Sequence, residues 1–429
     1  MIGRRRSEAR AIALEVAYRL RDASLRERAQ AQLYNGTSFP ELARPEPLSV
    51  AHGDAGLALT FSYFDAAFPG AGWDEAAHAA LSDAVVAAGG RETTISLFGG
   101  LAGVGLAASL LARGGGRYRG LLDSVDEAVS AEVMRRLSLP IKPGLPPRVF
   151  DVISGWSGVV SYLLFRPTEP RVVAAAVKRL IEISKISNGI PRWFTPAQLL
   201  HDRHQARACP GGCVNLGLAH GGPGILAALA LGLAAGVEVP RLRASVKATA
   251  ELLIGAALMD EFGKGWGTEL AVQPDGSLAP TSGRLARAGW CYGAPGVASA
   301  LWLAGDSLGE HRLREEAVAA MRAVHARPRE GRGLAGPTFC HGIAGLLATT
   351  LRFASRTRDP YLVNAAVALV DELISAYEPH SVLGFRSVEP DGRAVEHPGV
   401  LDGAAGVALV LLAASSGAEP AWDRLFMLS

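Results

Sequence analysis

The sequence contains few cysteines, few aromatic residues and almost no net charge. Four cysteines in 429 residues are too few for a disulfide framework, which argues against a disulfide-rich secreted protein. The formal net charge is +2, so the chain lacks the strongly basic field of a protein whose main partner is nucleic acid. With 49% hydrophobic residues the chain can bury a large core. We therefore expect a cytoplasmic protein that does not bind nucleic acid.

A long, uninterrupted hydrophobic run is also missing. The arginines at positions 4–6 precede an amphipathic stretch (residues 11–20) that is broken by charges, unlike the apolar core of a signal peptide. Residues 216–237 carry no Asp, Glu, Lys or Arg and are long enough to span a bilayer, but helix-breaking glycines and Pro223 interrupt this run near its start. We expect a buried core helix there and not an integral membrane protein.

Glycine, by contrast, is abundant and follows a repeating pattern. Seven Gly-x-x-Gly turns each precede an apolar run; they lie at residues 53–56, 100–103, 155–158, 221–224, 293–296, 342–345 and 403–406. Amphipathic, charge-bearing helical segments lie between these turns. Repeated helical pairs must stack or close to bury their apolar faces, and helices that are apolar on nearly all sides need partners all round. The pattern predicts an all-α fold, a closed double ring (α/α toroid) of seven inner and seven outer helices.

Four regions depart from this repeat or precede it. Residues 7–33 have the spacing of one amphipathic helix. Residues 265–276 and 384–392 are typical of short strands joined by Pro-Asp-Gly turns, which predicts small β-hairpins. Residues 188–215 are rich in Pro, Trp, His and Cys without helical periodicity, so we expect an inserted loop or small subdomain within a single domain of residues 1–429.

Two of the turns carry soft metal ligands. Cys291 stands just before the fifth turn, and Cys340 and His341 stand just before the sixth. Two thiols and one imidazole are three of the four ligands of a tetrahedral zinc, and the free fourth position is typical of a catalytic site. From the residues alone, a purely structural role for these side chains remains the alternative.

Further candidates lie near the same kind of turn. His220 directly precedes the fourth turn and has three interpretations: a fourth metal ligand, a general acid or base, or a core histidine. Asp151 precedes the third turn, where it is either a helix cap or part of a charged network. Arg287, four residues before Cys291, is either solvated or part of that network. His52 has no second signal and is interpreted as structural.

A second cluster of potential ligands lies in the insertion. It consists of His201, His204, Cys209 and Cys213, but the spacing H-x-x-H followed by C-x-x-x-C is not a familiar zinc pattern. We therefore expect no second metal there.

The strings at three of the turns, together with the seven-fold repeat, resemble one family. These strings are W-C-Y-G-x-P-G at 290–296, C-H-G at 340–342 and H-G-x-x-G at 220–224. Over nearly the whole chain the sequence is similar to the lanthipeptide cyclases, the LanC-like family. The resemblance implies the double-ring fold and a zinc ion (Zn2+) held by Cys291, Cys340 and His341.

The resemblance also implies a reaction. In this family a peptide Cys thiol adds to dehydroalanine or dehydrobutyrine in a dehydrated precursor peptide, forming lanthionine or methyllanthionine. It implies that His220 transfers a proton and that Asp151, Arg287 and Tyr292 are the other active-site positions. Our hypothesis is that Arg287 stabilises the enolate, Asp151 orients or tunes His220, and Tyr292 assists by hydrogen bonding. A dehydratase and an exporter are the further partners that the family implies.

Other functions remain open from the sequence. A LanC-like relative that adds glutathione or another thiol to dehydroamino acids in proteins would use the same zinc residues. A non-enzymatic helical scaffold that binds peptides is another class. A helical-ring glycosidase needs two carboxylates, which Asp54, Asp151 and Asp402 could supply, but that function leaves the cysteine and histidine pattern unexplained.

Overall fold

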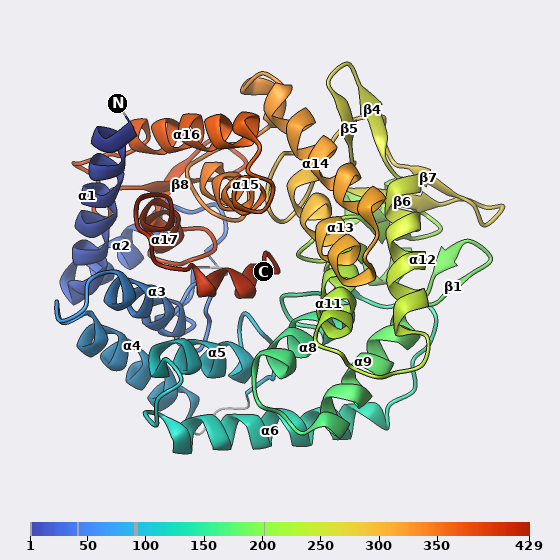
Figure 1. Cartoon of the computed structure of the whole chain (residues 1–429), viewed down its shortest axis with the longest axis horizontal. Coiled ribbons are helices and arrows are strands. Elements are labelled where there is room, and N and C mark those ends of the chain that lie inside the picture. The colour runs from blue at the N-terminus through green and yellow to red at the C-terminus, as the bar shows by residue number, and fades with distance from the viewer. Residues whose placement is uncertain (1, 41–42, 90–92, 201) are drawn as a thin grey trace. The chain divides into compact units, whose positions relative to one another are not determined.

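The computed structural model describes residues 2–40, 43–89, 93–200 and 202–429, and it is mainly helical (Figure 1). An apolar helix follows each of the seven Gly-x-x-Gly turns, as predicted, and the first glycine of each turn is the helix N-cap. These helices are α3 (Asp54–Ala67), α5 (Leu101–Ala112), α8 (Trp156–Phe165), α11 (Gly222–Ala234), α13 (Ala294–Leu308), α15 (Ile343–Thr357) and α17 (Ala404–Ser415).

The more polar helices alternate with these apolar helices along the chain. They are α4 (Trp73–Ala88), α6 (Arg119–Leu137), α9 (Pro170–Ser184), α12 (Leu242–Gly255), α14 (His311–Ala326) and α16 (Pro360–Ser375). The pairs α3–α4, α8–α9, α11–α12, α13–α14 and α15–α16 are in contact. The sequence repeat is therefore a repeat of packed helical pairs.

The last apolar helix takes its partner from the other end of the chain. Helix α1 (Ile2–Arg21) packs against α17 and α16, as Figure 1 shows. The prediction of one helix over residues 7–33 is wrong, because α1 ends at Arg21 and a second helix, α2 (Ala23–Gly36), begins after Asp22. The Asp22 carboxylate accepts hydrogen bonds from the backbone N–H groups of Ser24 and Leu25, which is a standard N-cap.

Contacts divide the chain into two compact units. The first consists of Met1–Thr94, Phe98–Val125 and Leu334–Asp423, and the second of Ile95–Leu97, Asp126–Gly333 and Arg424–Ser429. Each unit buries its own aromatic side chains, such as Phe64 and Trp73 in the first and Trp290 and Phe426 in the second. A single domain over residues 1–429 stays a prediction.

The glycine pattern has a steric cause that is clearest at Gly224 and Gly296. A Cβ atom at Gly224 would lie 2.5 Å from the carbonyl oxygen of Leu218, and one at Gly296 would lie 2.5 Å from that of Trp290. In both turns the chain folds back so that a carbonyl six residues earlier presses on the first turn of the helix. Only glycine permits this close approach, which holds the preceding loop against the helix N-terminus.

The strands form small antiparallel sheets. They are β1 (Ile186–Ser187) with β2 (Ile190–Pro191), β3 (Cys213–Asn215) with β6 (Glu269–Val272) and β7 (Leu278–Pro280), β4 (Leu258–Asp260) with β5 (Gly263–Gly265), and β8 (Arg386–Val388) with β9 (Ala394–Glu396). Both predicted Pro-Asp-Gly turns are confirmed, since they join β6 to β7 and β8 to β9. The first hairpin starts at Glu269 and not at Gly265, because Gly265 already pairs with Leu258.

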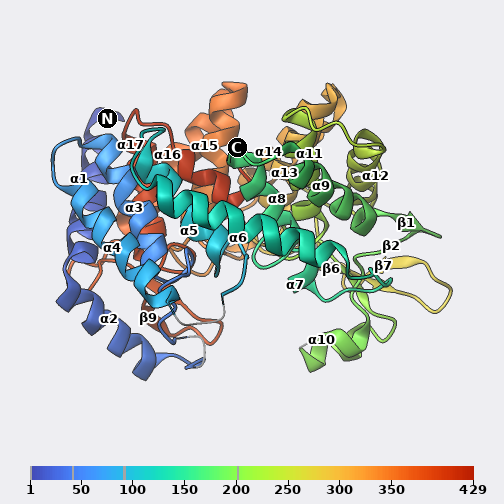
Figure 2. The same cartoon turned by 90° about the horizontal axis from the view of Figure 1, so that it is seen from below.

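Residues 188–215 contain more regular structure than their composition suggests. They include a 3-10 turn (Ala197–Leu199), the short helix α10 (Arg203–Ala208) and strand β3. Figure 2 shows α10 well apart from α8 and α11 of the same unit. The remaining short helices are α7 (Pro147–Phe150) and the 3-10 turns Glu330–Arg332 and Ala421–Phe426. That the segment is an inserted subdomain stays a prediction.

Within the described residues, no helix is both long enough and apolar enough to cross a membrane. The charge-free run at 216–237 forms α11, which has 13 residues, most of them buried. The prediction of a buried core helix in this run is therefore confirmed.

Candidate active site

Cys291 lies in the loop before α13, and its neighbours hold that loop rigidly. The Trp290 indole is fully buried, donates a hydrogen bond from Nε1 to the Phe426 carbonyl oxygen at 2.8 Å, and packs edge-on against the Phe426 ring. Gly293, the N-cap of α13, has φ +97°, a conformation that favours glycine. As a result, Cys291 is buried, with 7% of its surface exposed.

Cys340 and His341 lie in the corresponding loop before α15. Phe339 is fully buried against Trp422, and the Cys340 backbone N–H donates to the Leu401 carbonyl oxygen at 2.8 Å. Both Cys340 and His341 are half-buried. The two side chains therefore remain accessible while the backbone that carries them is fixed.

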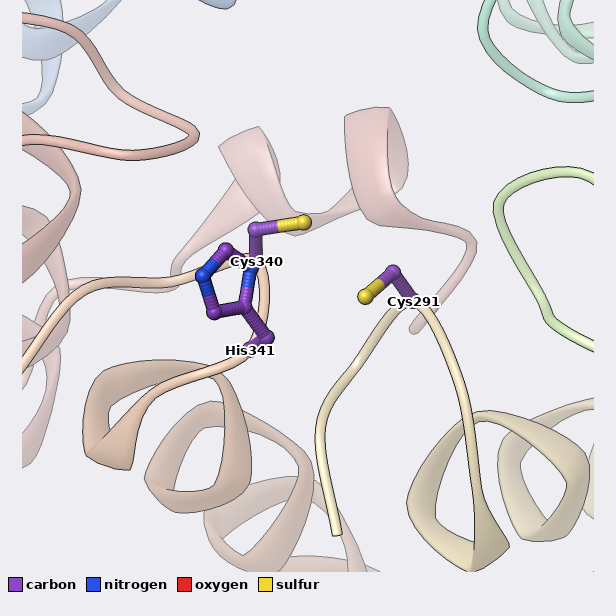
Figure 3. A group of neighbouring side chains, drawn as sticks. All are labelled: Cys291, Cys340 and His341. Atoms are coloured by element: carbon purple, nitrogen blue, oxygen red, sulfur yellow. The ribbon is translucent and has the colours of Figure 1, made fainter. Parts of the chain in front are cut away.

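The three predicted metal ligands form one cluster. One ligand atom from each of Cys291, Cys340 and His341 lies within 4.8 Å of the others (Figure 3). Two sulfur donors and one nitrogen donor suit zinc, which favours thiolate and imidazole ligands in four-coordinate sites. Among the described residues this is the one group of this kind. The donor set is therefore one that could hold a zinc ion.

His220 and Asp151 are joined although they lie 69 residues apart. His220 Nδ1 is 2.6 Å from Asp151 Oδ2, and the Asp151 side chain is 3% exposed while that of His220 is 41% exposed. Asp151 Oδ1 accepts hydrogen bonds from the backbone N–H groups of Ser154 at 2.7 Å and Gly155 at 2.8 Å. Asp151 Oδ1 thus holds the loop before α8 while Oδ2 faces His220. The interpretation of Asp151 as a helix N-cap is wrong, because the N-cap of α8 is Gly155, and its place in a charged network at the site stays a prediction.

Two backbone hydrogen bonds connect this pair with the Cys291 loop. Val152 N–H donates to the Ala219 carbonyl oxygen at 3.0 Å, and Ala219 N–H donates to the Cys291 carbonyl oxygen at 3.4 Å. The loop that carries His220 therefore lies directly beside the loop that carries Cys291.

Tyr292 follows Cys291 and has a defined partner. Its hydroxyl oxygen accepts a hydrogen bond from Asn215 Nδ2 at 2.8 Å. Burial raises the pKa of Tyr292 to about 12, so the hydroxyl stays protonated near neutral pH. The phenol is therefore a potential hydrogen-bond donor at the same loop.

Comparison with known proteins identifies the family. The family described as lanthionine synthetase C-like protein matches residues 44–427. This chain belongs to that family. By sequence, the chain is similar to the nisin biosynthesis protein NisC from Lactococcus lactis subsp. lactis, with 24% identity over 306 residues (68% of this chain and 71% of that protein). By structure, it is similar to nisin cyclase, with a TM-score of 0.75 and 20% identity over 89% of this chain and 92% of that one.

The structural match confirms the predicted fold class, the all-α double ring of the LanC-like family with small β-hairpins. The family itself was also correctly predicted from the turn strings. The zinc ligands and the roles of the other site residues stay predictions.

Arg287 is another of the predicted site residues. It is exposed, and no hydrogen bond or ion pair joins its guanidinium to a described residue. Its backbone is nevertheless held, because the next residue, Ala288, donates to the Arg332 carbonyl oxygen at 2.7 Å. The proposed contact of Arg287 with an enolate therefore stays a prediction.

The second cysteine cluster shows no metal site in the part of the chain that the structure describes. Cys209 and Cys213 are buried beside Glu269, and burial raises the pKa of Cys209 to about 11 and that of Cys213 further still, which keeps both thiols protonated. His204 is exposed, and His201 lies outside the described residues. That this segment holds no second metal stays a prediction.

One residue of the site was missed from the sequence. Asn215 is 7% exposed and contacts Tyr292, yet a single asparagine at the end of an irregular segment carries no distinguishing pattern. Its only sequence signal is its place five residues before His220.

Proposed function

We propose that this LanC-like protein is a zinc-dependent cyclase that forms lanthionine and methyllanthionine. In this proposal, Cys thiols of a dehydrated precursor peptide add to dehydroalanine or dehydrobutyrine of the same peptide. Membership of the family and the similarity to a nisin biosynthesis protein support the class of reaction. The observation that carries the proposal is the cluster of Cys291, Cys340 and His341.

The donor set suits this chemistry. A zinc ion held by Cys291, Cys340 and His341 would lower the pKa of a substrate thiol below its ordinary value of about 8.5 at the free fourth position. Two thiolate ligands reduce the Lewis acidity of the metal, so a substrate thiolate there stays nucleophilic. The addition forms one S–C bond at the β-carbon, and the electron pair of the C=C bond passes to an enolate.

The enolate then needs a proton at its α-carbon, and in this proposal His220 delivers it. Because the Asp151 carboxylate accepts at Nδ1, the proton on that nitrogen is fixed and Nε2 is the atom that exchanges protons with substrate. Protonation at the α-carbon completes the reaction without any oxidant or reductant, since the proton that sulfur loses is balanced by the one that carbon gains. Asp151 acts through His220 and does not touch substrate in this proposal.

Two further side chains complete the proposed site. The protonated Tyr292 hydroxyl donates to the substrate oxygen on which negative charge develops, and Arg287 adds a positive charge from the exposed side of the loop. A dehydratase that prepares the peptide, an exporter and a cytoplasmic location are further parts of the proposal.

The first test is zinc content together with turnover. We expect about one zinc per purified chain, lost in Cys291→Ala and Cys340→Ala while far-UV circular dichroism keeps its helical signal. His204→Ala is the matched control, because it removes an exposed histidine of the second cluster. A parent protein without zinc after reconstitution would contradict the proposal.

Turnover is measured with a synthetic peptide that contains one dehydroalanine and one Cys. Cyclisation leaves the peptide mass unchanged, so the products are treated with N-ethylmaleimide, which adds mass only to peptide that still has a free thiol. We expect the fraction of peptide that forms the adduct to fall faster with the enzyme than without it. Addition of glutathione to the dehydroalanine in preference to ring closure would instead support the thiol-adding relative.

A further inference from the structure

Asn215 stands at the end of β3, and both ends of its side-chain amide are engaged. Asn215 Oδ1 accepts a hydrogen bond from the Gly217 backbone N–H at 2.8 Å, and Nδ2 donates to the Tyr292 hydroxyl oxygen at 2.8 Å. The two bonds fix the orientation of the amide. A backbone N–H can only donate, so the oxygen must face Gly217 and the NH2 group must face Tyr292.

This orientation decides whether the Tyr292 hydroxyl donates or accepts in its hydrogen bond with Asn215. An amide NH2 group has no acceptor, so the phenol oxygen accepts from Asn215 and cannot donate to it. The phenol hydrogen is left for a different partner. A carboxylate at position 215 would have the opposite effect, because it would take up that hydrogen.

The surrounding backbone leaves the arrangement little freedom. A Cβ atom at Gly217 would lie 2.6 Å from the Cys291 carbonyl oxygen and 2.8 Å from Cδ1 of the Tyr292 ring. A Cβ atom at Gly221 would lie 2.6 Å from Asn215 Oδ1. The Asn215 amide is therefore enclosed by the His220 loop, and the Tyr292 ring packs against the same loop.

We propose that Asn215 is a positioning residue that commits the Tyr292 hydroxyl to donating its hydrogen to the substrate. The proposal rests on the cyclase function proposed above. Asn215 itself does not touch substrate. It keeps the phenol hydrogen directed at the oxygen on which negative charge develops, where a preorganised donor lowers the barrier.

The decisive variant is Asn215→Asp, which keeps the shape and reverses the polarity. One carboxylate oxygen still accepts from Gly217, and the other accepts the Tyr292 hydrogen. With the dehydroalanine peptide as probe, we expect kcat to fall roughly 100-fold, as in Tyr292→Phe, with KM little changed. The double variant should be no slower than the slower single variant, because both remove the same donor. Asn364→Asp, the same change at an exposed position on α16, should have no effect.

A second readout does not depend on turnover. The protein has eight tyrosines, so incorporation of 3-fluorotyrosine gives a countable set of 19F resonances, and Tyr292→Phe identifies the one from Tyr292. In the zinc-loaded protein, Asn215→Asp should shift that resonance and leave the others in place, whereas Asn364→Asp should shift none.

The possible failures are distinguishable. An unshifted Tyr292 resonance in Asn215→Asp would overturn the hydrogen bond on which the inference stands. A double variant whose losses multiply would show that Asn215 does not act through Tyr292. If the Tyr292 resonance shifts as expected in Asn215→Asp but the parent protein never closes the ring, the proposed cyclase function is overturned. The positioning role is then overturned with it, while the hydrogen bond stands.

Discussion

Replacing Asp151 with asparagine separates the two tasks of this carboxylate. Oδ1 holds the loop before α8 by accepting from Ser154 and Gly155, and Oδ2 holds His220 Nδ1 at 2.6 Å. In Asp151→Asn the amide oxygen keeps these two bonds, so the free energy of unfolding should change by less than about 1 kcal/mol. The NH2 group then faces His220, so the imidazole must present a bare Nδ1 and carry its proton on Nε2.

The expected effect on catalysis follows from the bond that is lost. A hydrogen bond to a charged group contributes about 1.5–3 kcal/mol. At about 1.36 kcal/mol for each factor of ten, kcat should fall roughly 10- to 150-fold. The loss appears in kcat because the imidazole has its proton on the wrong nitrogen, whereas zinc content and peptide affinity depend on other residues.

The assay is the rate of thiol loss from the dehydroalanine peptide, measured for the parent, Asp151→Asn and His220→Ala. Asp123→Asn is the matched control, since Asp123 is exposed on α6. If His220→Ala is inactive while Asp151→Asn keeps the parental kcat, the pairing of Asp151 with His220 has no part in proton transfer and the reasoning is refuted.

Three further results are expected. Removal of zinc by a chelator should abolish thioether formation but keep the far-UV circular dichroism of the helices, because buried aromatic residues hold the ligand loops; loss of helix would contradict this. Gly224→Ala should lower the free energy of unfolding by about 1–3 kcal/mol, because its Cβ would meet the Leu218 carbonyl oxygen at 2.5 Å. Gly232→Ala in the same helix should not lower it, because the nearest atom to that Cβ is 3.5 Å away. Urea unfolding measures both variants, and equal losses of stability would argue against the steric cause. Burial, helped by nearby His52, lowers the pKa of His397 to about 3, so between pH 6.5 and 3 the unfolded chain binds the extra proton. From pH 7.5 to 5.5 the free energy of unfolding should therefore drop by about 1.4 kcal/mol through this group, and a His397→Asn variant with the same pH dependence would refute that.

Much of the fold was predictable because its signals are local. A glycine that must accept the close approach of a carbonyl is needed wherever the turn occurs, so the seven turns and their helices are visible in the sequence. The Pro-Asp-Gly turns are local in the same way. The break at Asp22 was missed because residues on both sides keep helical spacing, and only the capping hydrogen bonds of its side chain show that one helix ends and another begins.

The sequence by itself determined the family, the repeat and the chemical nature of the candidate metal ligands, since Cys291, Cys340 and His341 each stand beside a recognisable turn. Tertiary structure alone decided which distant side chains form hydrogen bonds and which helices pack together. It joined Asp151 to His220, aimed the Asn215 amide at Tyr292, and paired the first helix with the last apolar one. The physical reason is that a turn or a helix is specified by neighbours in the chain, whereas a hydrogen bond between distant residues depends on how loops fold back onto one another, and no periodicity in the sequence records that.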